Sequence, residues 1–124
     1  MFFPKFPTLY MPTYDKFDIL DKDMLVIDFI TQSQCEDLIN IADKHGNWES
    51  LSYDKFPAQE IRMKELGLWE ELEKHWQKHL YPLIERYWHP IEMYGLRDAF
   101  VMRYAMDTQT SLAYHHDASL VTGS

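Results

Sequence analysis

Apolar residues recur at helical spacing in the first half of the chain. They follow the i, i+3, i+4, i+7 positions of one helical face, at Cys35, Leu38, Ile39 and Ala42. Ser33 and Glu36 have the spacing of a capping box, which satisfies free N–H groups where a helix begins. Gly46 is a typical residue just after a helix C-terminus. The pattern therefore predicts a helix over residues 33–45.

The longest periodic segment covers residues 68–88. Large apolar residues recur along it at helical spacing: Trp69, Leu72, Trp76, Leu80, Leu83 and Tyr87. Pro82 lies inside the segment and lacks a backbone N–H, so we expect it to kink the helix or to split it in two. His75 and His79 are four residues apart, a spacing that can bind zinc. Because no Glu follows His75, we interpret them as two partly exposed helical histidines.

Three shorter stretches are rich in β-forming residues and predict strands, at 24–30, 98–106 and 112–122. The residues between the elements predict less regular structure: an extended, proline-punctuated arm at 1–14, loops at 15–23 and 47–60 anchored by Trp48, a short helical turn at 60–67 and a polar turn at 107–111. We expect two parts, an arm over residues 1–23 and one domain over 24–124.

Composition narrows the class of protein. A chain of 124 residues fits one small domain, and its net charge of −8 comes without the basic stripe of a nucleic-acid binder. Cys35 is the only cysteine, so neither an internal disulfide nor a cysteine-based zinc site can form. No apolar run reaches the length of a membrane helix, and the prolines near the N-terminus do not fit a signal peptide. We therefore expect a cytoplasmic location and no transmembrane segment.

Candidate chemistry is concentrated at residues 115–117, which read His-His-Asp. On a strand, residues i and i+2 share a face, so His115 and Asp117 would point the same way and His116 the opposite way. One imidazole and one carboxylate are two members of the two-His, one-carboxylate set that binds ferrous iron. The tripeptide alone favours a solvated polar turn over a metal site, because such a short motif often occurs by chance.

The flanking residues add specificity. Residues 100–119, "FVMRYAMDTQTSLAYHHDAS", resemble the catalytic domain of the lysyl hydroxylases, which are procollagen-lysine 2-oxoglutarate 5-dioxygenases within the iron(II)/2-oxoglutarate oxygenase superfamily. The matching positions are Phe100, Val101, Arg103, Tyr104, Gln109, Ser111, Leu112 and His115 to Ser119. Upstream, Pro57, Ile61 and Met63 match a second family segment, from which Glu60 and Arg62 depart. The likeness spans residues 24–124.

The resemblance implies roles for particular residues. His115 and Asp117 would be iron(II) ligands, and Tyr104 would help to bind the cosubstrate 2-oxoglutarate. Ascorbate would be the reductant, and the substrate would be a peptidyl lysine, as in collagen-like sequences. Ser119 and Thr122 could line the pocket, although an ordinary strand role is the simpler interpretation of both. Family members can form homodimers, so a homodimer is a further expectation.

The resemblance also implies a fold. It is an α+β domain in which N-terminal helices pack on the first strands of a double-stranded β-helix, or jelly roll, that is incomplete in this chain. The second iron-binding His and the Arg that holds 2-oxoglutarate are expected further downstream in the family. We therefore expect the isolated chain to be an inactive fragment of such an enzyme. The alternative is a non-catalytic interaction or dimerisation module derived from the same domain.

Overall fold

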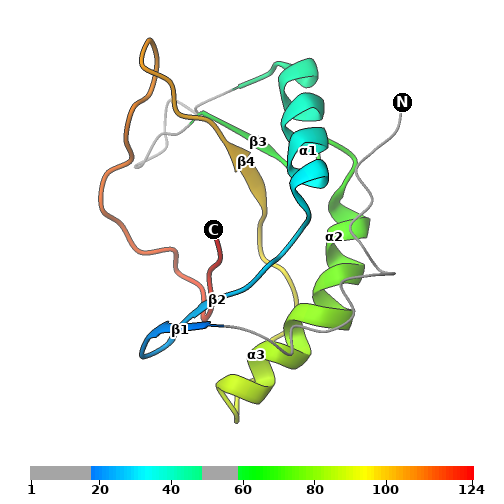
Figure 1. The fold of residues 1–124 in the computed structure, drawn as a ribbon, viewed down its shortest axis with the longest axis vertical. Coiled ribbons are helices and arrows are strands. Elements are labelled where there is room, and N and C mark those ends of the chain that lie inside the picture. The colour runs from blue at the N-terminus through cyan, green and yellow to red at the C-terminus, as the bar shows by residue number, and fades with distance from the viewer. Residues whose placement is uncertain (1–17, 49–58) are drawn as a thin grey trace.

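The computed structural model describes residues 18–48 and 59–124 (Figure 1). The predictions for the arm at 1–14, for residues 49–58 of the loop and for Pro57 lie outside this part of the chain. The described elements, in chain order, are β1 (Asp18–Asp21), β2 (Met24–Val26), α1 (Gln32–His45), β3 (Glu60–Arg62), α2 (Trp69–His75), the π-helical turn η1 (Trp76–Leu80), α3 (Tyr81–Tyr87) and β4 (Phe100–Met102).

β1 and β2 form an antiparallel hairpin at one end of the molecule (Figure 1). The predicted loop at 15–23 is thus wrong for β1, and the predicted strand at 24–30 ends already at Val26. All four residues of β1 are exposed, so this strand lacks the alternation of buried and exposed positions that reveals a strand in a sequence. Trp88 ties the hairpin to the end of α3, because its Nε1 donates to a carboxylate oxygen of Asp23 over 3.0 Å.

The helix predicted at 33–45 is confirmed as α1, but its capping differs from the prediction. Thr31 is the N-cap: its hydroxyl accepts from the backbone N–H of Gln34, and the Gln34 side chain accepts from the Thr31 N–H. The Ser33–Glu36 capping box is therefore wrong by two residues. Gly46 closes the helix with φ +73°, the left-handed conformation expected of a C-terminal glycine.

The buried face of α1 is also rotated relative to the prediction. Gln34 and Ala42 are buried, whereas Cys35 and Ile39 are exposed. Only Leu38 and Ala42 of the predicted face contribute to the core, Leu38 being half-buried. A polar residue at position 34 concealed the true face, because Gln34 is buried with its polar groups hydrogen-bonded to Thr31.

The helical segment predicted at 68–88 forms as α2, η1 and α3 in succession (Figure 1). The hydrogen-bonding pattern changes just before Pro82, as the N–H of Tyr81 donates to the carbonyl of Trp76, five residues back. A proline ring clashes with the carbonyl four residues before it, and the wider π-helical turn relieves that clash. The proline thus interrupts the α-helix as expected, and the predicted apolar face is buried at Leu72, Trp76 and Leu83.

β3 and β4 pair in antiparallel fashion, with Ile61 opposite Val101. The predicted helical turn at 60–67 is wrong for β3 but confirmed over 63–67, where a turn ends at Gly67. The predicted strand at 98–106 forms only over Phe100–Met102. Two backbone bonds extend the pairing, from Met63 to Ala99 and from Arg103 to Gln59, each 2.9 Å long. This two-stranded sheet carries the segment that leads to the His-His-Asp motif.

One hydrophobic cluster lies between α1, α2 and this sheet. Its buried members are Ala42, Ile61, Met63, Leu66, Leu68 and Leu72. Trp48, the predicted loop anchor, is half-buried against the cluster, and the Arg103 guanidinium lies 4.6 Å above its ring. In the described part of the chain, no helix is long and apolar enough to cross a bilayer.

Candidate metal centre at His115 and Asp117

The motif lies on an extended segment that leaves β4 and turns back along the molecule (Figure 1). The polar turn predicted at 107–111 begins earlier than expected, where the N–H of Ala105 donates to the carbonyl of Gln109 over 2.9 Å. The strand predicted at 112–122 is wrong, because these residues form neither a strand nor a helix. A β-strand needs a partner strand for its N–H and C=O groups, and the described residues supply none to this segment.

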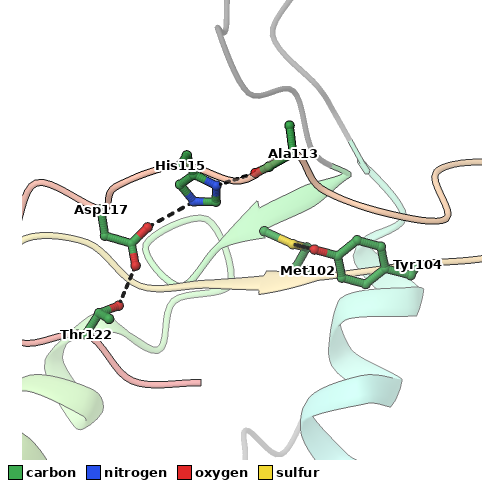
Figure 2. Close-up of polar contacts among 6 residues, drawn as sticks. All are labelled: Met102, Tyr104, Ala113, His115, Asp117 and Thr122. Carbon is green, nitrogen blue, oxygen red and sulfur yellow. Dashed lines mark hydrogen bonds and ion pairs between the residues drawn. The ribbon is translucent and has the colours of Figure 1, made fainter. Parts of the chain in front are cut away.

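The structure brings His115 and Asp117 together even without a strand. His115 Nε2 lies 3.0 Å from Asp117 Oδ1 (Figure 2). The prediction that these two side chains share a side is therefore confirmed, although they lie on irregular backbone followed by a bend at 119–120 and not on a strand. Ala118 has φ +49° in this segment, a left-handed conformation that reverses the chain immediately after Asp117.

A second contact orients the His115 ring. Its Nδ1 lies 2.7 Å from the carbonyl oxygen of Ala113, and because a carbonyl oxygen only accepts, this contact is a hydrogen bond when Nδ1 carries a proton (Figure 2). Nε2 is the nitrogen that faces Asp117, and the two groups form an ion pair when His115 is protonated. Metal-binding histidines usually donate their second ring nitrogen to a carbonyl or carboxylate in this way, which fixes both the tautomer and the ring orientation.

The pair fits two neighbouring ligands of one metal ion. Metal ions bind imidazole nitrogen and carboxylate oxygen at about 2.0–2.2 Å, so two adjacent ligand atoms at right angles are about 3.0 Å apart. The Nε2–Oδ1 separation of 3.0 Å is compatible with this value, and it is also the ordinary distance of a hydrogen bond or ion pair between the two groups. Asp117 is 47% exposed in its side chain, so an ion can reach the pair from solvent. Among residues 18–48 and 59–124, no group of three or more His, Cys, Asp or Glu side chains is arranged to hold a metal.

Tyr104, the predicted cosubstrate residue, follows β4 by two positions and is 47% exposed. Its hydroxyl donates to Sδ of Met102 (Figure 2). A thioether sulfur is a weak acceptor, so a carboxylate ligand could replace it as the partner of the phenol. Tyr104 thus presents an accessible donor, and no contact in the described part of the chain joins it to His115 or Asp117.

Two residues contribute to the site more than the sequence suggested. Thr122 donates from Oγ1 to Asp117 Oδ2 over 2.8 Å, so it contacts a predicted ligand directly. Arg97 donates from Nη1 to the carbonyl of Ala118, within the turn that follows Asp117. Thr122 could have been found from its proximity to the motif, whereas nothing in the sequence connects Arg97 to a residue so much later.

His75 and His79 form a separate pair on the helical segment, with ring centroids 5.1 Å apart. The interpretation of both as partly exposed is wrong for His75, which is completely buried. Burial, and to a smaller extent the neighbouring His79, lower the pKa of His75 from 6.5 to about 4. His75 is therefore neutral at physiological pH and packs on the buried side of the helical segment.

Comparison of the sequence with known proteins identifies relatives of this chain. The procollagen-lysine,2-oxoglutarate 5-dioxygenase of Drosophila melanogaster is 31% identical over 113 residues, and the match covers 81% of this chain and 15% of the fly protein. The chain is related to the lysyl hydroxylases. Procollagen-lysine,2-oxoglutarate 5-dioxygenase 1 of Homo sapiens is 28% identical over 110 residues, covering 81% of this chain and 15% of the human protein.

A viral lysyl hydroxylase relative matches a longer part of the chain. The procollagen lysyl hydroxylase and glycosyltransferase of Acanthamoeba polyphaga mimivirus is 25% identical over 129 residues, covering 91% of this chain and 14% of the viral protein. The chain thus spans about one seventh of the length of these relatives. No protein-family profile matches it. The resemblance predicted from residues 100–119 is confirmed by these relatives.

Proposed function

We propose that this chain is part of an iron(II)- and 2-oxoglutarate-dependent dioxygenase that hydroxylates a peptidyl lysine. The observation that carries the proposal is the His115–Asp117 pair, whose ligand atoms lie 3.0 Å apart in a chain related to procollagen-lysine 5-dioxygenases. In a decayed domain without metal chemistry, nothing would favour an imidazole fixed by Ala113 and directed at a carboxylate fixed by Thr122.

Each residue has a defined part in this proposal. His115 holds the metal through Nε2 while its Nδ1–H stays bonded to the Ala113 carbonyl, and Asp117 supplies one carboxylate oxygen. The Tyr104 hydroxyl donates a hydrogen bond to a carboxylate of 2-oxoglutarate. Bound iron and 2-oxoglutarate supply the oxidising power, with ascorbate as reductant, and the protein positions the lysine side chain.

We extend the proposal to the fold. β3 and β4 are the first strands of a double-stranded β-helix, against which α1 and the helices from Trp69 to Tyr87 pack. The cluster that joins Ile61 to Ala42 and Leu72 supports this arrangement, since it covers one face of the small sheet with helices. The third protein ligand and the arginine that binds 2-oxoglutarate come from residues other than those described.

Metal binding by the chain itself is the first test. We expect Mn(II), a paramagnetic substitute for Fe(II), to broaden the NMR signals of residues 113–122 selectively and in a saturable way. His115→Ala and Asp117→Ala should each abolish this site, whereas His116→Ala, the matched control next to both, should leave it intact. Equal broadening in the wild-type chain and both ligand variants would contradict the proposed metal centre.

The reaction is tested in a longer protein. The segment of the Drosophila relative that corresponds to residues 24–124 is replaced by this chain's segment, and succinate formation is measured with a lysine-containing collagen-like peptide. We expect turnover that depends on His115 and Asp117 but not on His116. Tyr104→Phe should raise the KM for 2-oxoglutarate more than it lowers kcat, because it removes a binding contact. A folded chimera that binds metal and makes no succinate would refute the activity.

The alternative, a non-catalytic interaction module, rests on a different observation. Several large apolar side chains beyond α3 are strongly exposed: Tyr94, Met106, Tyr114 and Leu120. Exposed apolar side chains commonly mark contact surfaces. This alternative predicts an association that Tyr114→Ser and Leu120→Ser weaken and that metal chelation and His115→Ala leave unchanged, as analytical ultracentrifugation would measure.

A further inference from the structure

The two oxygens of the Asp117 carboxylate have different partners. Oδ1 faces His115 Nε2 at 3.0 Å. Oδ2 accepts a hydrogen bond from the Thr122 hydroxyl, with 2.8 Å between the two oxygens. Figure 2 shows these contacts leaving the carboxylate in different directions, one toward the imidazole and one toward Thr122. The two contacts together set the rotation of the carboxylate about its bond to Cβ.

Thr122 reaches Asp117 because the chain reverses between them. The reversal begins at Ala118, whose φ of +49° is left-handed, and the Ala118 carbonyl accepts from the Arg97 guanidinium. A residue five positions after the carboxylate is thereby returned to it. The contact does not depend on a sheet or a helix, since residues 113–122 form neither.

A carboxylate can bind a metal through one oxygen or through both. Two-oxygen binding would require Oδ2 to turn toward the ion and to lose its hydrogen bond from Thr122. Hydrogen bonds to an ionised carboxylate are among the stronger ones in proteins, so this loss is unfavourable. We infer that Thr122 is a positioning residue that holds Asp117 as a one-oxygen metal ligand. The inference rests on the proposed metal centre, where one-oxygen binding by Asp117 would leave more coordination positions for cosubstrate and oxygen.

The test compares three variants of the full chain, with Mn(II) alone as the probe. Thr122→Val keeps the side-chain shape and removes the hydroxyl, Thr122→Ser keeps the hydroxyl, and Thr110→Val makes the same change as the first at another exposed position of the segment. Affinity comes from Mn(II)-dependent NMR broadening. Binding by one or two oxygens comes from the infrared carboxylate bands of Asp117, whose separation is larger for one-oxygen binding.

We expect Thr122→Val to weaken Mn(II) binding about 10–100-fold, the usual effect of losing a group that orients a ligand. It should also narrow the separation of the carboxylate bands. Thr122→Ser should restore both properties, and Thr110→Val should change neither. Because Thr122 is exposed and outside the core cluster, circular dichroism should show unchanged helix content in every variant.

Other outcomes overturn the inference in distinguishable ways. Wild-type affinity and band separation in Thr122→Val would show that Thr122 does not position Asp117, while His115-dependent binding would leave the metal centre itself intact. Weakened binding that Thr122→Ser fails to restore would assign Thr122 a packing role instead. Absence of His115-dependent binding in the wild-type chain would remove the metal centre and this inference together.

Discussion

The His75 imidazole lies edge-on to the Phe29 ring, with centroids 5.0 Å apart and planes at 82°. Phe29 precedes α1, so this contact joins the segment before the first helix to the interior of the second helical segment. An aromatic ring and complete burial surround His75 with apolar material, which disfavours its protonated form. The packing of His75 against Phe29 therefore makes the stability of the fold depend on pH.

We predict that the free energy of unfolding falls as the pH drops below neutrality because of His75. Its folded pKa of about 4 lies below the unfolded value of 6.5, so between these values the unfolded chain binds the proton more readily. The contribution is complete above pH 6.5 and is lost progressively down to pH 4. The loss is on the order of 3 kcal/mol, from about 1.4 kcal/mol for each pKa unit.

Urea unfolding at a series of pH values measures this contribution. His75→Phe should flatten the pH dependence of the free energy of unfolding across that range, because it removes the titrating group and keeps a ring against Phe29. His45→Gln, at an exposed position in the last turn of α1, is the control and should leave the pH dependence unchanged. A wild-type dependence that persists in His75→Phe would assign it to other groups.

Capping of α1 gives a second prediction. Thr31→Ala should destabilise the protein by about 1 kcal/mol, because it removes the acceptor for the Gln34 N–H. Ser33→Ala should change stability by less than about 0.5 kcal/mol, as expected of an exposed position without a capping role. Thermal unfolding measures both. A larger effect at Ser33 than at Thr31 would favour the capping box first predicted from the sequence.

The core cluster gives a third prediction. Ile61→Ala should cost about 2–5 kcal/mol, because it deletes a completely buried side chain from the middle of the sheet–helix contact. Ile39→Ala makes a similar chemical change at a residue that is 54% exposed and should cost much less. Chemical denaturation of both variants tests this. Comparable costs would mean that α1 buries the face predicted from its apolar spacing.

Arg97 gives a fourth prediction. Arg97→Gln removes the guanidinium that donates to the Ala118 carbonyl and should loosen the turn between Asp117 and Thr122. We expect Mn(II) affinity to fall, by less than in Thr122→Val, because the direct contact with the carboxylate is retained. Arg62→Gln, at an exposed position of β3, is the control and should bind Mn(II) like the wild type. A wild-type affinity in Arg97→Gln would show that the turn holds without it.

The sequence predicted helices better than strands for a physical reason. A helix satisfies its backbone within one segment, so the apolar spacing around Leu72 and Leu83 and the cap at Gly46 were sufficient signals. A strand depends on a partner: the pairing of Ile61 with Val101 joins residues that no local pattern connects. Residues 112–122 have the β-forming composition of a strand but no partner among the described residues, and they form none.

The proximity of His115 and Asp117 was predictable from the sequence, whereas the contacts around the pair were not. Their two-residue spacing was the signal, because residues i and i+2 of an extended segment point the same way. The hydrogen bond from Thr122 depends on the left-handed backbone conformation of Ala118. Alanine rarely adopts this conformation, so the sequence gives no signal for it. Arg97 acts across a separation of 21 residues, which only the folded chain reveals.

The short sheet of β3 and β4 has a consequence for how the molecule opens. Its ladder continues through the N–H groups of Met63 and Arg103, and the Gln59 N–H is bonded to the Gln109 side chain over 2.6 Å. These amides should exchange with deuterium together and slowly, as one cooperative unit with the core cluster. The hairpin of β1 and β2 is mostly exposed, so its amides should exchange far earlier. Local unfolding of the molecule should therefore begin at this hairpin.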